Sequence, residues 1–360
     1  MNGRERIAAA VTGGVGAALA ARALRGRGYD FADKVVVITG GSRGLGLALA
    51  RELADEGARL ALLARDAAEL DRAAEDLAAR GAAPLTLPCD VRDREDVDRA
   101  VARVVEHYGR LDVLINVAGV IQVGPVQHMT LDDFADAMAV HFWGPLYATL
   151  AAAPQLRRQG GGRVVNIASI GGLVAVPHLI PYAASKFALV GLSDGLRAEL
   201  ARDGIVVTTV CPGLMRTGSP PNALFKGRHR AEYTWFALGD ALPGLSIDAR
   251  RAARQILGAC RRGDPSLTIT LPARALAAAN ALAPNLMGEA MKLVTRLLPD
   301  PTGPEGEVAR PGRESTSPLA PSPLTALSDR AAARNNELPE AAPASDIPRS
   351  GVETGVSTWT

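Results

Sequence analysis

The chain has 360 residues, 48% of them hydrophobic, and its 40 basic and 38 acidic side chains give a formal net charge of +2. This length and apolar content suffice for one large α/β domain with extensions, or for two small domains. The nearly balanced charge, with arginines dispersed among acidic residues, excludes broad binding to nucleic acid.

The cysteines exclude two further kinds of site. Cys89, Cys211 and Cys260 lie far apart, and they show neither a CxxC spacing nor a companion histidine pattern. An odd number of thiols also argues against a disulfide framework. We therefore predict no disulfide and no metal site, and we expect buried, reduced thiols.

The first 33 residues are interpreted as an extension that precedes the domain. Residues 7–21 carry no charge, are mostly Ala and Gly, and are flanked by arginines on both sides. A helix needs about 20 apolar residues to span a bilayer, so this stretch is short for a membrane span. We expect a helical extension or a disordered lead, with a membrane anchor or a surface-associated helix as the alternative.

From Lys34 onward, short β-rich apolar runs alternate with helical segments, which is typical of a parallel sheet covered on both faces. The predicted strands are 35–39, 60–63, 85–87, 113–116, 164–167, 206–210 and 267–270. The predicted helices are 46–56, 67–80, 94–108, 131–159, 182–202 and 248–262. The pattern predicts an α/β fold with one doubly wound Rossmann domain, a seven-stranded parallel sheet spanning residues 34–275.

The C-terminal part divides into two segments. Residues 276–299 are amphipathic and interrupted by Pro284, which predicts two packing helices, with membrane-surface or dimer contact as the alternative. Residues 300–360 are rich in Pro, Ser, Glu and Ala and predict a disordered tail, because they bury too little apolar surface to offset chain entropy. A short helix over 324–336, on a partner or on the main domain, is the alternative within this tail.

The first strand leads into the glycine-rich run Thr39-Gly40-Gly41-Ser42-Arg43-Gly44-Leu45-Gly46. Gly40, Gly44 and Gly46, at the first, fifth and seventh positions after the strand, let the backbone turn tightly and approach a pyrophosphate. They also start a helix whose N-terminal dipole faces the phosphates. Because the run follows a strong strand and precedes a helix, it predicts a dinucleotide-binding loop rather than an ordinary turn.

Charged residues near this loop bear on the type of dinucleotide. An NAD site has an acid near the end of the second strand, but this chain has Arg65 there and Arg43 inside the glycine loop. Two guanidinium groups suit a 2′-phosphate, so NADP(H) is favoured over NAD(H), with a surface role for Arg65 as the alternative. Asp90, followed by Val91 after the third strand, is placed to bind the adenine amino group, with helix capping as the alternative.

Proton chemistry is indicated by Tyr182 and Lys186, with Ser169 thirteen residues before the tyrosine. A tyrosine has an ordinary pKa of about 10, and a nearby fixed positive charge lowers it. If Tyr182 opens a helix, a residue four positions later lies on the same face. The compact ammonium of a lysine can hydrogen-bond a ribose hydroxyl while it stabilises a phenolate.

Together these motifs resemble those of the short-chain dehydrogenase/reductase family across about residues 34–265. The glycine loop resembles the family's TGxxxGxG, Asn116-Val117-Ala118-Gly119 its NNAG, and Ser169, Tyr182 and Lys186 its catalytic triad. The resemblance implies that Tyr gives or takes the proton of the substrate oxygen and that Ser hydrogen-bonds that oxygen. It also implies that Lys binds the nicotinamide ribose and lowers the Tyr pKa.

The resemblance extends to the cofactor contacts and to assembly. Pro212-Gly213 followed by Thr217 is similar to the motif that meets the nicotinamide end. The family also implies a homodimer or homotetramer. The cofactor-binding set expected from motifs and charges is Thr39, Gly40, Ser42, Arg43, Gly44, Leu45, Gly46, Arg65, Asp90, Val91, Asn116, Ala118, Gly119, Tyr182, Lys186, Pro212, Gly213 and Thr217.

Two positions depart from the family pattern. Val117 replaces the second Asn of NNAG, which leaves the structural work to the backbone and Asn116. His141, four residues after Ala137, stands where the family has an asparagine that holds a water of the proton relay. An imidazole can also hydrogen-bond a water or a carbonyl, and it titrates near about pH 6.5. We interpret His141 as a catalytic substitute in the relay, or alternatively as a packing residue with slower turnover or a shifted optimum.

Substrate specificity is expected in the loops 171–181 and 217–245, at the carboxyl ends of the strands. A mobile lid over an apolar substrate, a dimer or membrane-facing patch, or core packing would each explain the aromatic cluster Phe225, Tyr233, Trp235 and Phe236. His178 is either a pocket residue or an ordinary loop residue.

The sequence therefore predicts an NADP(H)-dependent carbonyl reductase or alcohol dehydrogenase that acts on an apolar or lipid-like ketone, aldehyde or alcohol. A dinucleotide-binding regulatory or scaffold protein with reduced or no turnover is the alternative. We expect a cytoplasmic protein, with membrane association through residues 7–21 as the alternative location.

Overall fold

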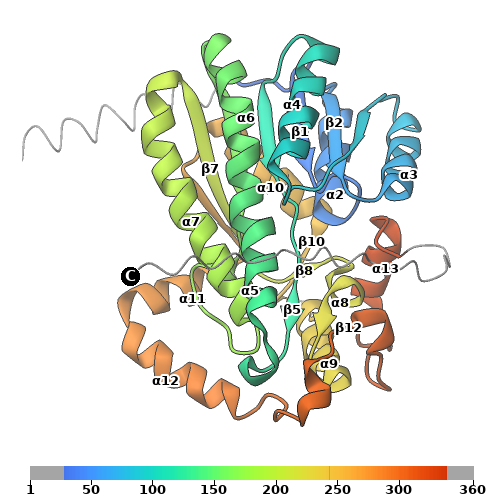
Figure 1. The fold of residues 1–360 in the computed structure, drawn as a ribbon, viewed down its shortest axis with the longest axis vertical. Helices are drawn as coiled ribbons and strands as arrows, with labels where there is room; N and C mark the ends of the chain where they lie inside the picture. The colour runs from blue at the N-terminus through green and yellow to red at the C-terminus, as the bar shows by residue number, and fades with distance from the viewer. Residues whose placement is uncertain (1–27, 243, 339–360) are drawn as a thin grey trace, which may run out of the picture.

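The computed structural model of the chain describes residues 28–242 and 244–338 (Figure 1). Its main element is a seven-stranded sheet ordered β11-β7-β6-β4-β1-β2-β3, in which every neighbouring pair is parallel. The strands are β1 (Val35–Thr39), β2 (Arg59–Ala64), β3 (Leu85–Pro88), β4 (Val113–Asn116), β6 (Gly162–Ile167), β7 (Ile205–Pro212) and β11 (Ser266–Ile269). The predicted doubly wound α/β fold and its seven strands are confirmed.

The strand order reverses at β1, which pairs with β2 on one side and with β4 on the other. In open α/β sheets, ligands bind in the crevice at the carboxyl ends of the strands where this reversal occurs. Thr39 at the end of β1 lies level with Asn116 at the end of β4. The fold therefore brings the glycine loop and the loop after Asn116 to the same crevice.

Helices cover both faces of this sheet (Figure 1). Along β1 the buried side chains alternate, since Val36 and Ile38 belong to one core and Val35 and Val37 to the other. One face is covered by α2 (Gly44–Asp55), α3 (Ala67–Ala78) and α10 (Ala249–Arg262), and the other by α4 (Arg94–Tyr108), α6 (Gly144–Arg158) and α7 (Ile180–Leu200). Both faces of the sheet are thus apolar, as a central parallel sheet requires.

Helix α10 shows how the local sequence specifies these helices. Its N-cap Asp248 accepts hydrogen bonds from the backbone N of Arg250 and Arg251, and Gly263 ends it with a left-handed φ of 69°. The buried residues recur at helical spacing, at Ala249, Ala252, Ala253, Ile256, Leu257, Ala259 and Cys260. These signals explain why the predicted helix over 248–262 matches the observed one to within a residue.

The long helix predicted over 131–159 is interrupted in the structure. It consists of α5 (Leu131–Met138), a π-helical turn (Ala139–Trp143) and α6. The backbone N of Gly144 bonds to Ala139 O, five residues back, as a π-turn requires. Hydrophobic periodicity alone does not reveal such a turn, which contains His141, because the residues on both sides remain helical.

Smaller elements surround the carboxyl ends of the strands. β5 (Gln122–Val123), β9 (Leu224–Phe225) and β12 (Arg310–Pro311) form one small sheet, and β8 (Met215–Arg216) and β10 (Ile247–Asp248) form another. The remaining α-helices here are α8 (Ser219–Asn222), α9 (His229–Ala241) and α13 (Ala326–Arg334). Short 3-10 turns cover Val126–His128, Ile170–Gly172, Ala201–Asp203, Pro304–Glu307 and Gly312–Glu314.

The segment predicted as two helices over 276–299 forms α11 (Leu271–Leu282) and α12 (Pro284–Thr295), divided at Pro284 as expected. Packing on the domain is limited. Ala273 is the buried residue of α11, and α12 has no buried residue. The prediction of two packing helices is therefore correct for the helices and wrong for the packing of α12.

The prediction of a disordered tail over 300–360 is wrong for the residues that the structure describes, 300–338. They add β12 to the sheet of β5 and β9 and place α13 beside α9. Backbone and side-chain hydrogen bonds, rather than apolar burial, supply most of these contacts, which is why composition did not indicate them. The alternative of a short helix over 324–336 on the main domain is confirmed by α13, while residues 339–360 lie outside the described part.

Three further predictions concern the ends of the chain and its thiols. Residues 7–21 lie outside the described residues, whereas Phe31, placed in the N-terminal extension, is fully buried in the main core. Across 28–242 and 244–338, none of the helices combines the length and apolar character that crossing a membrane requires. The prediction of buried, reduced cysteines is confirmed at all three positions.

Candidate active site

The glycine loop between β1 and α2 requires its glycines for steric reasons. Gly40 has a φ of +68°, and a Cβ on it would lie 2.8 Å from the Ala118 Cα. A Cβ on Gly46 would lie only 2.0 Å from the Gly40 carbonyl oxygen. The first turn of α2 can therefore pack directly on the end of β1, which brings its N-terminus to the crevice.

Two predicted cofactor residues serve mainly to hold this crevice together. The Thr39 Oγ1 accepts hydrogen bonds from the backbone N of Val117 at 3.2 Å and of Ala118 at 3.4 Å. The Asn116 Nδ2 donates to Asn166 Oδ1 at 2.8 Å. These contacts join the ends of neighbouring strands, so the NNAG-like loop is fixed beside the glycine loop as predicted.

The arginine in the glycine loop has protein partners. Arg43 Nη1 donates to Asn222 Oδ1 at 2.7 Å and lies 3.3 Å from Glu69 Oε1, and the Ser42 hydroxyl donates to the other Glu69 oxygen at 2.9 Å. Arg65 is exposed at the end of β2. The sequence analysis missed Glu69, because nothing in the local sequence places the first turn of α3 against the loop.

Asp90 and Val91 follow β3, as predicted. Burial opposes ionisation of Asp90, but hydrogen bonds from Arg92 outweigh this effect and lower its pKa. The closest contact joins Arg92 Nη2 to Asp90 Oδ2 at 2.6 Å, and Arg92 also contacts Asp136 at 3.0 Å. The carboxylate is thus held at the edge of the crevice by an ion pair, and contact with adenine stays a prediction.

Ser169, Tyr182 and Lys186 converge where β6 ends and α7 begins. Lys186 Nζ donates to the Ile167 carbonyl at 2.9 Å and lies 5.7 Å from the centre of the Tyr182 ring. Gly171 permits the close approach of the other two, since a Cβ there would lie 3.1 Å from Tyr182 Cε1 and 3.4 Å from Ser169 Oγ. The three side chains that the sequence singled out therefore meet in one place.

The pKa values in this triad differ from the expectation. Burial raises the pKa of Tyr182 to about 12, although a hydrogen bond with Ser169 lowers it. Burial also lowers the pKa of Lys186 to about 7. Loss of water dominates the pKa of Tyr182, and the groups that shift it do not include Lys186, so the expected lowering by Lys186 is not seen.

His141 lies fully buried beneath this triad and uses both ring nitrogens. Its Nε2 accepts a hydrogen bond from the Val120 backbone N at 3.1 Å, so its Nδ1 carries the proton and donates to Ser185 Oγ at 2.8 Å. Burial, reinforced by Lys186, lowers the His141 pKa well below its usual value. The imidazole is therefore neutral, and it meets the Tyr182 ring edge-on at 5.4 Å between centroids.

The third predicted cofactor segment follows β7. A Cβ on Gly213 would lie 2.6 Å from Thr270 Oγ1, so only glycine fits there. The Thr217 hydroxyl lies 2.7 Å from the Ser219 hydroxyl at the start of α8. Pro212 is the last residue of β7. The segment thus reaches the same end of the sheet as the glycine loop.

The aromatic residues between 225 and 236 are mostly core, which agrees with the core-packing alternative and not with a lid or an exposed patch. Phe225, Tyr233 and Phe236 are buried in a small apolar cluster that includes Ala320 of the C-terminal segment. Trp235 is partly buried and donates through Nε1 to Glu232 Oε2 at 2.7 Å. The described C-terminal residues cover these rings, and the sequence analysis had placed those residues in a disordered tail.

His178 is also a buried structural residue. Its Nδ1 lies 2.8 Å from Glu232 Oε1, and its backbone has a φ of +63°. Asp240, which lies on α9 like Glu232, was missed by the sequence analysis. Burial raises its pKa to about 8, and it interacts electrostatically with both Tyr182 and Glu337. Asp240 is therefore a buried carboxyl group within electrostatic range of Tyr182.

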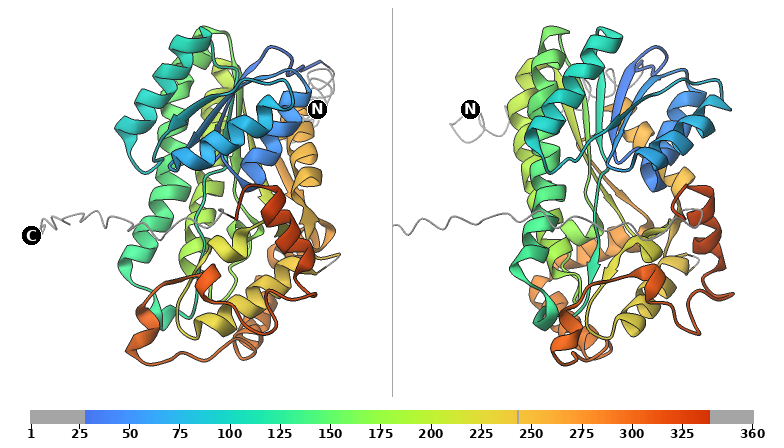
Figure 2. Two further views of the ribbon diagram at one scale, coloured as in Figure 1. Left: turned by 90° about the vertical axis from the view of Figure 1, so that its right-hand side faces the viewer. Right: turned by 45° about the vertical axis from the view of Figure 1, so that its right-hand side comes forward.

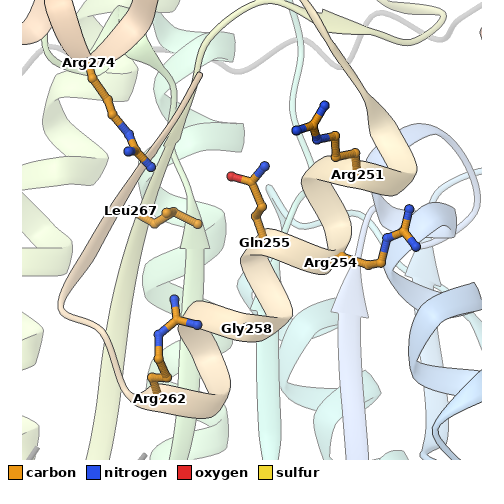
Figure 3. Close-up of a pocket in the computed structure, with 7 residues that line it drawn as sticks. All are labelled: Arg251, Arg254, Gln255, Gly258, Arg262, Leu267 and Arg274. Atoms are coloured by element: carbon orange, nitrogen blue, oxygen red, sulfur yellow. The ribbon is translucent and has the colours of Figure 1, made fainter. Parts of the chain in front are cut away.

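A separate basic groove lies on the outer side of α10, away from this site (Figure 3). It has a volume of about 560 Å³ and is lined by Arg251, Arg254, Gln255, Gly258, Arg262, Leu267 and Arg274. Helix α10 covers the face of the sheet opposite to α7, which carries Tyr182. The groove is therefore not part of the candidate active site.

Comparisons with known proteins agree with this geometry. Residues 34–223, more than half of the chain, match the family model described as short chain dehydrogenase. The chain is 40% identical over 188 residues to a putative ketoacyl reductase of Streptomyces coelicolor, an alignment that covers 51% of this chain and 72% of that protein. It is 38% identical over 196 residues to a dehydrogenase/reductase SDR family protein 7-like of Anopheles gambiae, covering 53% of this chain and 62% of that relative.

A solved structure extends the similarity to three dimensions. The crystal structure of L-sorbose reductase from Gluconobacter frateurii, complexed with NADPH and L-sorbose, superposes with a TM-score of 0.61 at 25% sequence identity. The superposition covers 67% of this chain and 96% of that structure. The superposition therefore spans nearly all of that structure and leaves about a third of this chain without a counterpart.

Proposed function

The chain belongs to the short-chain dehydrogenase family, and we propose that it is an NADP(H)-dependent oxidoreductase that interconverts an apolar ketone or aldehyde and its alcohol. The observation that carries this proposal is the convergence of Ser169, Tyr182 and Lys186 at the crevice that the glycine loop borders. Members of the family are oxidoreductases that bind a nicotinamide dinucleotide and act on CH–OH groups.

The residues at the crevice fit such a cofactor. The close approach of Gly40 and Gly46 brings the backbone N–H groups at the N-terminus of α2 to the crevice, and a helix N-terminus is suited to a pyrophosphate. Pro212, Gly213 and Thr217 border the crevice at the nicotinamide end. The bound nicotinamide would supply or accept the hydride.

The preference for NADP(H) rests on Arg43 and Arg65. Both lie at the side of the crevice where the adenosine ribose is expected, and together they offer two guanidinium groups to a 2′-phosphate. Glu69 already lies beside Arg43, so a 2′-phosphate has to compete with this carboxylate. The preference is therefore expected to be moderate.

The catalytic residues perform distinct tasks in this proposal. The raised pKa of Tyr182 means that its phenol keeps its proton at neutral pH, which suits a proton donor for carbonyl reduction. Ser169 is close enough to Tyr182 for both hydroxyls to bind one substrate oxygen. Lys186 lies behind the phenol and is placed to bind the nicotinamide ribose.

In our proposal, His141 positions the catalytic residues of α7 through hydrogen bonds. It bonds to Ser185 Oγ, which in turn donates to the Tyr182 carbonyl oxygen at 2.8 Å. Because both ring nitrogens have partners, the imidazole positions the start of α7. A proton that His141 relayed would have to pass through the Ser185 hydroxyl or the Val120 N–H.

An apolar substrate is supported by three exposed leucines that follow β7 and α9. Leu214 follows β7, and Leu242 and Leu245 follow α9, with exposed fractions of 37%, 49% and 43%. Such side chains lower the cost of desolvating an apolar substrate. The similarity to a ketoacyl reductase agrees with this class without identifying the substrate.

The test is a screen of the purified full chain with NADPH, and separately NADH, against ketones, aldehydes and acyl thioesters of graded size. Oxidation of the reduced cofactor, with rates that rise with substrate apolarity, supports the proposal. Binding of the cofactor with no turnover on any class instead supports a dinucleotide-binding regulatory protein. One observation favours that second candidate: Glu337 lies inside the cofactor crevice.

Assembly and location complete the proposal. We propose a homodimer or homotetramer in the cytoplasm, with association to membranes through residues 7–21 as the alternative. Light scattering on the purified chain measures the first property. Fractionation of cells that express the chain with and without residues 1–28 measures the second, and loss of a membrane-bound fraction on deletion would establish the alternative.

A further inference from the structure

The C-terminal segment Arg334–Glu337 lies against the glycine loop, about 290 residues away in the sequence. The backbone N of Gly44, at the start of α2, donates to the Asn335 carbonyl at 2.9 Å. The Asn336 Nδ2 donates to the Ser42 carbonyl at 2.9 Å. Residues of the tail thus bind backbone groups of the loop that the cofactor phosphates are expected to approach.

Glu337 reaches further into the crevice and connects its two sides. Its carboxylate accepts a hydrogen bond from the backbone N of Gly218, next to Thr217. A Cβ on Gly44 would lie 2.8 Å from Glu337 Oε1, and a Cβ on Gly218 would lie 2.4 Å from the Glu337 Cβ. One side chain therefore touches both the phosphate-binding loop and the segment predicted to meet the nicotinamide end.

Basic and amide side chains from α2, α3 and α8 hold the segment in place. Arg51 donates to the Arg334 carbonyl at 2.9 Å and to Asn335 Oδ1 at 3.1 Å. The Arg72 Nε donates to Asn336 Oδ1 at 2.7 Å, and the Asn222 Nδ2 donates to the Glu337 carbonyl at 2.9 Å. Figure 2 shows the resulting position of α13, below α2 and α3 at the carboxyl ends of the strands.

The chemistry of this contact resembles that of a phosphate. Backbone N–H groups at a helix N-terminus favour anions, and a carboxylate can accept the hydrogen bonds that phosphate oxygens would accept. Here the acceptors at the start of α2 are the Asn335 carbonyl and, next to it, the Glu337 carboxylate. The segment consequently fills space that a bound pyrophosphate would need.

We propose that residues 334–337 are an internal ligand of the dinucleotide site, so that the C-terminal segment and the cofactor bind in mutual exclusion. The inference rests on the proposed function, because it requires a dinucleotide to bind in this crevice. Only molecules with a displaced segment are competent to bind. The apparent affinity for the cofactor is then reduced by the fraction of molecules in which the crevice is open.

The contact has features of an interaction that can be released. Only 7% of the Glu337 surface is exposed, so docking of the segment removes its carboxylate from water. Among the described residues, the buried Asn335 Nδ2 has no hydrogen-bond partner. Both features lower the net free energy gained when the segment docks. Helix α13, which carries the segment, is only nine residues long. A cofactor that offers stronger acceptors to the same N–H groups can therefore replace the segment.

The test is the affinity of the purified full chain for NADPH and NADH, measured by calorimetry, for the wild type and single variants. Glu337→Ala removes the carboxylate, Glu337→Gln removes only its charge, and Asn336→Ala removes the bonds to Ser42 and Glu69. Glu307→Ala is the matched control, because it deletes an exposed glutamate from the 3-10 turn Pro304–Glu307, outside the segment that contacts the glycine loop. Hydrogen exchange of residues 326–338, with and without NADPH, reports the position of the segment directly.

We expect Glu337→Ala to tighten NADPH binding about tenfold or more, Asn336→Ala to tighten it severalfold, and Glu307→Ala to leave it unchanged. NADPH should increase hydrogen exchange in residues 326–338 of the wild type. Unchanged or weaker binding by Glu337→Ala, with the segment still protected in the complex, would overturn the inference while leaving the proposed function intact. If no variant binds either dinucleotide, the proposed function fails, and the inference fails with it.

Discussion

The imidazole Nδ1 of His141 lies 2.8 Å from Ser185 Oγ, and this bond connects the π-helical turn to the helix that carries Tyr182 and Lys186. On its other side, His141 receives a hydrogen bond from the Val120 backbone N. The imidazole therefore fixes the distance between the loop after β4 and the start of α7. This relationship makes the histidine a positioning residue whose effect on catalysis can be measured.

His141→Asn should leave NADPH-dependent turnover within about tenfold of the wild type, which corresponds to about 1.4 kcal/mol in barrier. An asparagine amide retains a donor and an acceptor, although it is shorter than an imidazole. Steady-state kinetics from pH 5 to 9 is the measurement, because a positioning residue changes kcat while leaving the pH profile in place. A complete loss of turnover would mean that the proton path requires the imidazole itself.

His141→Leu serves as the companion variant. It deprives the Val120 N–H of its acceptor and leaves the Ser185 hydroxyl with only its bond to the Tyr182 carbonyl, and a buried polar group that loses its partner costs about 1–3 kcal/mol. The variant should therefore unfold at a clearly lower temperature than His141→Asn. Equal thermal stability of the two would show that these hydrogen bonds contribute nothing to the position of α7.

Arg43→Ala and Arg65→Ala should each weaken NADPH binding by about tenfold, since a charge-assisted contact to a phosphate contributes about 1.5–3 kcal/mol. NADH, which has no 2′-phosphate, should bind to both variants nearly as well as to the wild type. The measurement is the ratio of the two dissociation constants. Arg99→Ala, at an exposed site on α4, is the control for a general loss of positive charge.

If the ratio of the dissociation constants for NADPH and NADH is the same in both arginine variants as in the wild type, the proposed cofactor preference is contradicted. Glu69→Gln provides an independent check, because it removes the carboxylate that lies beside Arg43. This variant should raise the preference for NADPH.

Lys186 is expected to make stability depend on pH. Its folded pKa of about 7 is lower than its ordinary value, so above pH 7 the unfolded chain binds a proton that the folded chain releases. The contribution of Lys186 to the free energy of unfolding is therefore lowest below pH 7. It rises with pH until the ordinary lysine pKa of about 10.4 is reached. Relative to Lys186→Met, which has no such group, the wild type should gain stability as pH rises from 7 to 9.

Thermal unfolding of the two proteins without cofactor at several pH values tests this prediction. Taking the difference between them removes the contributions of other groups with raised pKa values, such as Asp240 and Glu337. A difference in unfolding temperature that does not vary between pH 7 and 9 would show that Lys186 keeps its ordinary pKa in the fold.

The sequence predicted those parts of the site that depend on local pattern. The glycine loop was predictable because Gly40 and Gly46 are needed sterically at fixed distances from a strand, and the triad because Tyr182 and Lys186 share a helical face. The fold followed from the alternation of apolar strands and amphipathic helices.

The remaining features depend on contacts between distant segments. Glu69 and Glu337 reach the glycine loop from α3 and from the C-terminal segment, and no local pattern connects either residue to that loop. The same holds for Phe225, which became core because a polar, proline-rich segment covers it. The pKa of Tyr182 was misjudged for a related reason, since its burial depends on the whole fold.

The central claim is that Tyr182 transfers a proton in a nicotinamide-dependent reaction, and Tyr182→Phe tests it most directly. The substitution removes one hydroxyl and keeps the ring that packs on His141. On the best carbonyl substrate of the screen, we predict that the variant loses reductase activity by a factor of at least about 1,000, while its dissociation constant for NADPH stays within about threefold of the wild type. Retained activity in a variant that still binds NADPH would contradict the account.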